Sequence, residues 1–409
     1  MRNIVEISVI VFIVFVIIFW AYSSSISSKN AKLALNKIQS NQVSYFFIKS
    51  NIEKINKIDN FFQQEYKRGQ FAGTILLSIK GQVVYKNSYG YANRKNKIPI
   101  TTNTFFQIGS MSKQFTAVAI LQLVSKGIIN LNDEVTKFYP NFPYKGITIR
   151  MLLTHKSGLP NYIYQFEESK EIDKTKLISN QEMVKYFIKN NEKEYAKPGK
   201  CYQYSNTGYA LLAAIIEKVT NMSFEEYVKK NIYEPIGMKN SFFYTDLYKG
   251  KVDSILHIAT GYISPSDEAG FFYLNGILGD KGMFSSLDEL YKWDISLYKA
   301  TLLPKNWIDS ALTIQTKTNK KNIYYGYGWK LYYLNDTFPI QFHSGWWQGY
   351  QSIIMRIPSD TITLIVLKNK KTQHPVNQKA IIDFLYPNNN FWNKDKKVNN
   401  EVQNSFQLE

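Results

Sequence analysis

The chain has very little cysteine and histidine. A single cysteine, Cys201, in 409 residues excludes an intramolecular disulfide. The four histidines lie far apart in the sequence, so no group of Cys and His residues has the spacing of a metal site. We therefore expect neither a metal ion nor an organic cofactor.

Arginine is also scarce, although the formal net charge is +18. The positive charge comes mostly from lysines that are scattered along the chain together with asparagine and isoleucine. A nucleic-acid-binding protein usually gathers arginines among base-stacking aromatic residues, so this pattern argues against nucleic acid as a partner. A solvated basic surface is the simplest interpretation, and a diffuse attraction to anionic envelope polymers is the alternative.

The N-terminus carries the longest apolar run, residues 7–22, after the early Arg2. The run is slightly short for a bilayer span of about 20 residues. It is near the upper limit of a signal-peptide core of about 7–15 residues, and Ala21 and Ser23 give a small-x-small pattern compatible with cleavage. We predict that residues 1–25 are a signal peptide or a membrane anchor, against the alternative of a buried core helix.

Both predicted forms of the N-terminus place the body of the protein outside the cytoplasm, in the periplasm or cell envelope, with Arg2 inside. Contact with the membrane through this segment depends on whether it is cleaved. Residues 26–50 are predicted to be a polar spacer, residues 51–387 a single enzyme domain, and residues 388–409 a disordered polar tail. Hydrophobic residues make up 44% of the chain, which permits a large core.

The pattern of apolar residues predicts an α+β fold. Residues from 51 read as an amphipathic helix, and residues 74–80 and 83–89 as a hairpin. The middle, about 130–310, is predicted to be mainly helical, with clear helices at 112–126, 208–219 and 287–298. Strands are expected at 329–334, 340–343, 351–357 and 361–367, followed by a helix at 376–385. The hairpin and the late strands should share one antiparallel sheet, with the helical middle inserted as a second lobe and a cleft between the lobes.

The string Ser110-x-x-Lys113 suggests a nucleophile beside an activating amine. Residues three apart share one face of a helix, and Ser110 lies where the predicted helix begins. Backbone N–H groups and the helix dipole there suit an oxyanion. Lysine is a poor base at its ordinary pKa of about 10.4, but burial and nearby positive potential would lower that pKa.

This pattern has competing interpretations. A second Ser-x-x-Lys occurs at Ser296–Lys299, late in a predicted helix and without a glycine turn before it. Ser110 follows an aromatic and apolar approach, made by Phe105, Phe106, Ile108 and Gly109, at the start of a helix, which favours it as the nucleophile. The alternative is that Ser110 is only the N-cap of its helix.

Two further strings add polar groups. Tyr204-Ser205-Asn206 follows a Pro-Gly loop and opens a helix, so the Tyr204 phenol could shuttle a proton and Asn206 could orient a carbonyl or amide. The pattern Tyr-x-Asn recurs elsewhere in the chain, and most tyrosines serve packing. His343-Ser-Gly345 precedes Trp346 and is the only His-x-Gly. A lone histidine is more often structural, but a strand edge with a glycine suggests close backbone approach by a ligand.

With these strings the chain resembles the β-lactamase-related serine hydrolases, which include class C β-lactamases, D-alanyl-D-alanine carboxypeptidases, D-aminopeptidases and family VIII esterases. The resemblance spans about residues 55–385. It rests on ordered co-occurrence of five segments: 108–113 (IGSMSK), 152–160 (LLTHKSGLP), 204–206 (YSN), 279–285 (GDKGMFS) and 343–345 (HSG).

The resemblance implies a β-lactamase/transpeptidase-like fold and a set of roles. Ser110 would be the acylated nucleophile, and Lys113 and Tyr204 would share the work of general base and acid. Asn206, His343, Gly345 and Trp346 would contact the substrate. The backbone N–H groups of Ser110 and Trp346 would form the oxyanion hole. His155 and Gly158 match a stretch that is structural in this family.

One position departs from the class C pattern, which has lysine where this chain has His343. Lysine offers a permanent cation to a substrate carboxylate, whereas histidine is only partly charged near neutrality. We therefore expect an exported serine hydrolase acting on small esters or amides, including D-amino-acid cell-wall peptides. A class C-like β-lactamase is the alternative within the enzymes. A non-catalytic module that binds penicillin or a wall ligand is the alternative of another class.

Overall fold

The structure is a computed structural model, and it describes residues 49, 51–253, 255, 257–264, 267–334, 338–372 and 376–388. The chain forms two units, residues 1–56 and 57–409. In the first unit the described residues, 49 and 51–56, are helical. The predicted signal peptide or anchor at 1–25, nearly all of the spacer at 26–50 and nearly all of the tail at 388–409 lie outside the described residues. The second unit holds every predicted site residue.

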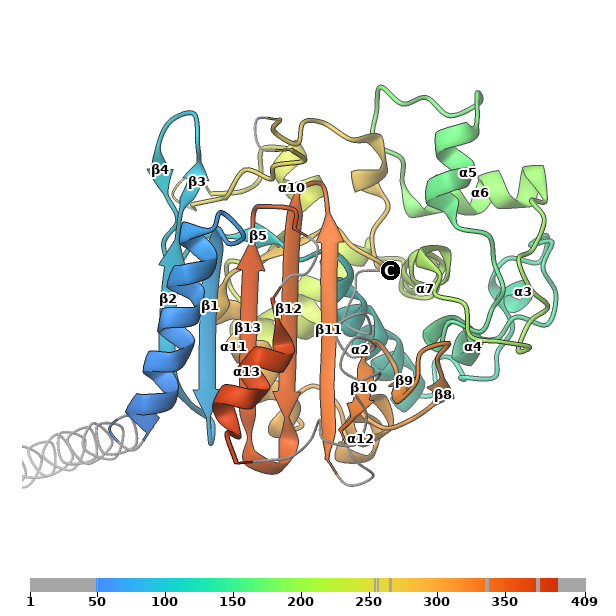
Figure 1. The fold of residues 1–409 in the computed structure, drawn as a ribbon. Coiled ribbons are helices and arrows are strands. Elements are labelled where there is room, and N and C mark those ends of the chain that lie inside the picture. Colours follow the sequence, from blue (N-terminus) through green and yellow to red (C-terminus); the bar gives the residue numbers. More distant parts are fainter. Residues whose placement is uncertain are drawn as a thin grey trace, which may run out of the picture. The chain divides into compact units, whose positions relative to one another are not determined.

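An eight-stranded antiparallel sheet forms the centre of the second unit, in the order β2-β1-β13-β12-β11-β10-β9-β8 (Figure 1). The early hairpin and the late strands therefore share one sheet, as predicted. The hairpin turns at Lys80 and Gly81, both with positive φ, and this suits a tight two-residue turn. The strands are β1 (Gly73–Ile79), β2 (Gln82–Tyr89), β8 (Thr316–Lys317), β9 (Ile323–Tyr325), β10 (Lys330–Tyr333), β11 (Pro339–Trp347), β12 (Tyr350–Ile357) and β13 (Ile362–Lys368).

A small three-stranded sheet, in the order β5-β7-β6, joins segments that are far apart in the sequence. The Ile108 amide also donates to the Met283 carbonyl at 2.9 Å. The residues just before Ser110 are thereby fixed to the segment 279–285. These strands, and the separate pair β3-β4, are β3 (Tyr91–Asn93), β4 (Ile98–Pro99), β5 (Phe106–Gln107), β6 (Phe242–Phe243) and β7 (Met283–Ser285).

The inserted middle of the chain is mainly helical, as predicted. Helix α7 lies at the centre of the helical lobe, which we define as α3–α7, and α7 contacts α2 as well as α3, α4, α5 and α6 (Figure 1). The helices of the middle are α3 (Val135–Phe138), α4 (Ile149–Leu153), α5 (Tyr162–Glu168), α6 (Asn180–Asn190), α7 (Asn206–Thr220), α8 (Phe224–Val228), η2 (Lys229–Tyr233), α9 (Glu234–Ile236), α10 (Tyr244–Tyr248), η3 (Tyr273–Gly276), α11 (Leu287–Tyr298) and α12 (Lys305–Ala311).

Helix α2 (Ser112–Ser125) is buried around its whole circumference along its first twelve residues. An apolar composition on all sides is typical of such a helix, and the predicted helix at 112–126 is confirmed. Phe115 stacks on Trp293 of α11 with ring centroids 4.0 Å apart. Gly127, with φ +70°, follows the helix as predicted for a C-terminal stop. The Lys113 side chain is thus held on a helix that is packed on all sides.

Both faces of the sheet are covered. The helical residues 57–67 and α13 (Gln378–Leu385) lie over one face (Figure 1), where the Phe61 and Phe384 rings meet at 5.9 Å. On the other face α11 contacts β1 and β13. Among the described residues, no helix has the length and apolar character that crossing a membrane requires.

Candidate active site

Ser110 lies in η1 (Gly109–Met111), a short 3-10 turn directly before α2. The N-cap positions of η1 and α2 are Ile108 and Met111, and neither makes a side-chain cap hydrogen bond. The interpretation of Ser110 as a simple N-cap is therefore wrong. The hydroxyl instead lies on the wall of a cavity.

The Lys113 ammonium joins three of the sequence strings. Its Nζ donates to Ser110 Oγ at 3.1 Å, to Asn206 Oδ1 at 2.8 Å and to the Asp280 carbonyl at 3.0 Å. The side chain is fully buried. Because these partners come from η1, α7 and the segment before β7, the contacts of one amine hold the two lobes in register around Ser110.

Tyr204 and Asn206 flank the start of α7. Ser205 is the N-cap of this helix, and its hydroxyl accepts from the Gly208 amide at 3.3 Å. This places Asn206 at the first helical position and Tyr204 just outside the helix. The Tyr204 ring centroid lies 4.9 Å from Lys113 Nζ, and both Tyr204 and Asn206 line the cavity with Ser110. The structure therefore brings these residues together.

Strand β11 lies inside the sheet, but only part of it is paired on both sides. Its partner β10 reaches from Pro339 to Phe342, whereas β12 follows it to Trp347. Residues 343–347 therefore present one edge toward η1, as Figure 1 shows where β11 extends beyond β10. The predicted strand edge is present in this limited sense.

Gly345 is required by the chain's own backbone. A Cβ at this position would lie 1.9 Å from the Ile108 carbonyl oxygen. The same carbonyl accepts from Ser352 Oγ at 2.6 Å. The close approach that the sequence suggested for a ligand is made by Ile108, and Gly345 is not among the residues that line the cavity.

His343 is buried, with 1% of its surface exposed, and it does not line the cavity. Its Nδ1 faces the Ser344 carbonyl at 2.8 Å, so Nδ1 carries the hydrogen and Nε2 accepts from the Tyr325 hydroxyl at 3.1 Å. Burial, and then the charges of Lys330 and Lys113, hold the pKa of His343 well below its ordinary value. The substrate contact expected of His343 is therefore not found. Its neutral imidazole lies next to Tyr204 instead, with ring centroids 6.5 Å apart.

His155 lies behind Tyr204 as well, with ring centroids 4.3 Å apart. Its Nδ1 accepts from the Ser205 amide at 3.1 Å, which ties the segment 152–160 to the start of α7. Burial is the main cause that keeps the pKa of His155 well below its ordinary value, and Lys113 adds to it. Its contacts are those of a residue that supports the Tyr204 loop.

The cavity has a volume of about 660 Å³. One wall is aromatic and contains Trp346 and Trp347, so both tryptophans face the site. Trp346 is 38% exposed, and its amide nitrogen lies close to the turn, 2.8 Å from where a Gly109 Cβ would stand. The other lining residues are Asn161, Ile163, Tyr164, Glu167, Tyr195, Gln203, Ile263, Phe272, Asp280, Lys281, Gln348, Gly349 and Lys371.

Sequence reasoning missed most of these walls. Asp280 and Lys281 belong to the segment 279–285, which was quoted for the resemblance without a role. The Asp280 carboxylate accepts from the Tyr162 hydroxyl at 3.0 Å. Lys281 Nζ donates to the Leu274 and Ile277 carbonyls at 2.7 Å, and burial lowers its pKa to about 8. Two adjacent charged residues in an otherwise apolar segment were the signal that could have marked them.

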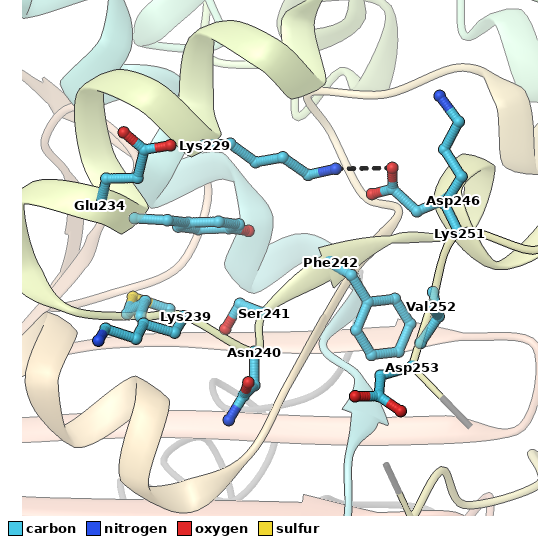
Figure 2. A pocket seen from close by; sticks show the side chains of 12 residues that line it. Lys229, Glu234, Lys239, Asn240, Ser241, Phe242, Asp246, Lys251, Val252 and Asp253 are labelled. Atoms are coloured by element: carbon cyan, nitrogen blue, oxygen red, sulfur yellow. Dashed lines mark hydrogen bonds and ion pairs between the residues drawn. The ribbon is translucent and has the colours of Figure 1, made fainter. Parts of the chain in front are cut away.

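A second cavity, of about 420 Å³, shares no lining residue with the first. Figure 2 shows its mixed charged and apolar wall, across which Lys229 and Asp246 form an ion pair at 2.6 Å. Its serine, Ser241, lies 3.0 Å from the Ser285 hydroxyl. None of the predicted site residues lines this cavity, so the Ser110 cavity is the candidate active site.

Comparison with known proteins identifies the family. The family model described as Beta-lactamase matches residues 58–384. Penicillin-binding protein 4* of Bacillus subtilis (strain 168) is 36% identical over 331 residues, which are 78% of this chain and 72% of that protein. Protein flp of Staphylococcus aureus (strain MW2) is 29% identical over 78% of this chain, which spans 64% of that protein.

A solved structure, the octameric penicillin-binding protein homologue from Pyrococcus abyssi, superposes with a TM-score of 0.69 at 30% identity. The match covers 81% of this chain and 77% of that chain. The fold is accordingly the mixed sheet-and-helix architecture of β-lactamases and penicillin-binding proteins. By the extent of the family match and by its similarity to these relatives, the chain belongs to the β-lactamase-related serine hydrolase family.

Proposed function

We propose that this protein is an exported serine hydrolase that forms an acyl-enzyme at Ser110 and acts on small esters or amides, with D-amino-acid peptides of the cell wall as the natural class. The observation that carries the proposal is the 3.1 Å contact between Ser110 Oγ and the buried Lys113 amine on the wall of an open cavity. A nucleophile within hydrogen-bond reach of an amine base is the arrangement that acyl transfer needs.

The proposed reaction has two steps. Ser110 Oγ attacks the carbonyl carbon while its proton passes to Lys113 or Tyr204, and the backbone amides of Ser110 and Trp346 stabilise the oxyanion. Tyr204 then gives the proton to the leaving group as the bond to it breaks. A water molecule attacks the ester in the second step and releases the acid, with the same residues exchanging the proton in reverse. Asn206, held by Lys113, orients the acyl group.

The substrate class follows from the cavity wall and from His343. A neutral, buried imidazole supplies no permanent cation to a carboxylate, which favours uncharged or distantly charged acyl groups over β-lactams. Penicillin-binding protein 4*, by its name, binds penicillin. A class C-like β-lactamase remains the alternative, and the observation in its favour is the same Ser110–Lys113–Tyr204 arrangement. The intact polar site argues against a module that only binds a wall ligand.

The export of the protein is proposed from the sequence of its N-terminus. The apolar run at 7–22, after Arg2, has the composition of a signal peptide or an anchor. The assembled cell wall lies outside the cytoplasm, so a substrate in the wall would require export. Fractionation of cells that express the full chain, with mass spectrometry of its N-terminus, would test export and cleavage together.

The assignment of the nucleophile has a direct test. A fluorophosphonate probe or a fluorescent penicillin should label the wild-type protein and leave Ser110→Ala unlabelled. Ser296→Ala is the matched control, because Ser296 opens the second Ser-x-x-Lys string but donates to the Trp293 carbonyl at 2.7 Å inside α11. This variant should be labelled like the wild type. Equal labelling of Ser110→Ala would remove Ser110 from its role, and no labelling of any folded form would favour the binding module.

A panel of three substrates distinguishes the esterase, D-peptidase and β-lactamase activities. p-Nitrophenyl acetate, a chromogenic cephalosporin and a D-Ala-D-Ala peptide should be compared at equal enzyme concentration. We expect turnover of the ester and slower turnover of the peptide, because its terminal carboxylate, like that of the cephalosporin, finds no permanent cation at His343. The cephalosporin should acylate Ser110 but turn over slowly. Rapid turnover of the cephalosporin alone would favour the β-lactamase.

A further inference from the structure

Tyr204 has a second lysine beside it that none of the family strings contains. Lys330 is the first residue of β10, and only 4% of its surface is exposed. Its Nζ lies 5.5 Å from the centroid of the Tyr204 ring, and Lys113 Nζ lies 4.9 Å from the same centroid. Two lysine amines from different elements therefore lie near the Tyr204 ring.

The backbone fixes Lys330 in this place. The loop before β10 contains Gly328, whose φ is +78° and whose Cβ would lie 2.8 Å from the Lys113 carbonyl oxygen. A side chain cannot be accommodated there, so the loop rests directly on α2 at Lys113. Strand β10 starts two residues later. The position of Lys330 relative to Lys113 is thus a consequence of backbone packing rather than of a flexible side chain on the surface.

Among the groups near the Tyr204 ring, two are lysines and two are neutral imidazoles. The neighbouring imidazoles of His155 and His343 are buried, and their pKa values are lowered first by burial and then by the lysines, so they add no negative charge. The Asp280 carboxylate, which lines the same cavity, accepts from Tyr162 and lies 3.8 Å from Lys281. The titratable groups near the Tyr204 ring include Lys113, His155, Tyr325, Lys330 and His343.

We propose that Lys330 is a positioning residue for the proposed hydrolysis, and that its ammonium acts with Lys113 to stabilise the deprotonated phenol of Tyr204. The inference rests on the proposed function, because the phenolate matters only if Ser110 is acylated. The class C enzymes have lysine at the position of His343. In this chain that position is neutral, and Lys330 of the adjacent strand lies over the Tyr204 ring instead of lining the cavity.

The physical reason is the sign and the distance of the charge. A cation about 5 Å from the ring centroid of a phenolate in a buried site favours the charged form more strongly than it would in water. Removing this cation should raise the pKa of Tyr204, so that the phenol keeps its proton to higher pH. In a variant without the Lys330 charge, the acylation rate should then begin to rise at higher pH than in the wild type. The rates of the two proteins should converge at a pH where Tyr204 is ionised in both.

The test measures the second-order rate of Ser110 labelling by a fluorophosphonate across pH in the wild type, Lys330→Met and Lys330→Arg. Methionine keeps the length and apolar stem without the charge, and arginine keeps the charge. We expect Lys330→Met to move the rising limb by about one pH unit or more and to slow labelling about tenfold below that limb. Lys330→Arg should restore the wild-type limb. Circular dichroism and thermal unfolding establish that each variant is folded.

Two outcomes would overturn the inference. A uniform loss of rate in Lys330→Met at every pH, with the limb unmoved, would assign Lys330 a structural role only. The ultraviolet tyrosinate signal of Tyr204, obtained by reference to Tyr204→Phe, can be measured even if catalysis is weak. An identical titration of this signal in the wild type and in Lys330→Met would also assign Lys330 a structural role only. Labelling that survives Ser110→Ala would instead refute the proposed function, so the two failures are distinguishable.

Discussion

His155 and His343 both lie next to the Tyr204 ring, with ring centroids 4.3 and 6.5 Å from it. Each is buried, and each has its pKa held well below the ordinary 6.5 by burial first and by nearby lysines second. Each is neutral in the folded chain as a result. A neutral imidazole can pack against an aromatic ring and accept one hydrogen bond without bringing a third charge to the site. The positive charge near the Tyr204 ring therefore comes from lysine side chains and not from histidine.

A pH dependence of stability follows for these two residues. An unfolded chain would bind more protons than the folded one between the lowered pKa and 6.5. The contribution of these two residues to the free energy of unfolding should thus be level above pH 6.5 and decrease as the pH falls below it. Urea unfolding of the wild type and of His343→Gln on both sides of pH 6.5 measures this, and the variant should show a shallower decrease. Exposed His257 gives the control His257→Gln, whose slope should match the wild type. Equal slopes in all three proteins would contradict the prediction.

At the scale of elements, the contact between η1 and β11 determines where the nucleophile stands. Gly345 has no positive φ, but its Cβ would lie 1.9 Å from the Ile108 oxygen. Neither backbone can give way easily, since Ile108 is also bonded to β7 and β12. Any side chain at this position must push the Ser110 turn away from the strand.

Gly345→Ala should therefore reduce Ser110 labelling by more than about tenfold and lower stability by about 1–3 kcal/mol, the range for overpacking. Gly270→Ala is the control, because Gly270 has open space around its Cβ and no positive φ. Labelling rates and urea midpoints of the two variants provide the measurement. A Gly345→Ala protein with wild-type labelling would show that the turn is not fixed by this contact.

The elements that sequence patterns predicted are those with local periodicity. Helices α2, α7 and α11 and strands β1, β2, β12 and β13 lie within a few residues of the expected ranges. The short strands β5, β6 and β7 were missed, because two or three residues carry no periodicity and their pairing joins distant parts of the chain. The role of Gly345 was assigned to a ligand for the same reason, since the sequence does not report which backbone approaches a glycine.

At the scale of the whole molecule, the fold and the clustering of Ser110, Lys113, Tyr204 and Asn206 were predictable, and most of the cavity wall was not. These four residues stand in ordered strings, whereas much of the remaining wall comes from α5, from the end of β11 and from loops. Loop residues such as Phe272 and Lys371 have no pattern that would place them beside a serine more than a hundred residues away. Sequence reasoning placed one side chain, His343, at the cavity, whereas it is buried. The sequence could not show this, because burial depends on neighbours in the fold such as Tyr325.

Helix α11 is joined to the sheet by a buried polar network. Arg356 of β12 donates to Asp294 Oδ1 at 2.6 Å and to Gln341 Oε1 at 2.8 Å, and the Thr363 hydroxyl donates to Asp294 Oδ2 at 2.7 Å. Arg356 and Asp294 are each only 1% exposed. These bonds link the helix to three strands, so they bear on the stability of the entire second unit.

Asp294→Ala should lower the free energy of unfolding by about 3–5 kcal/mol, because it leaves the Arg356 charge buried without its partner. Asp288→Ala on the same helix is the control. Asp288 is 55% exposed and pairs with Lys86 at 2.7 Å, so its loss should cost about 0–1 kcal/mol. Urea denaturation of both variants measures the difference. A similar small effect for both would mean that the network contributes little to holding the helix on the sheet.

The two tryptophans on the cavity wall give the site an optical property. Trp346 is 38% exposed with the Lys371 amine 4.7 Å from its ring, whereas Trp347 is 8% exposed and donates to Asn275 at 2.6 Å. A molecule that fills the cavity would shield the first indole from solvent and from a soluble quencher while leaving the second almost unchanged. Occupancy can therefore be followed by intrinsic fluorescence, with no dye attached and before any bond is broken.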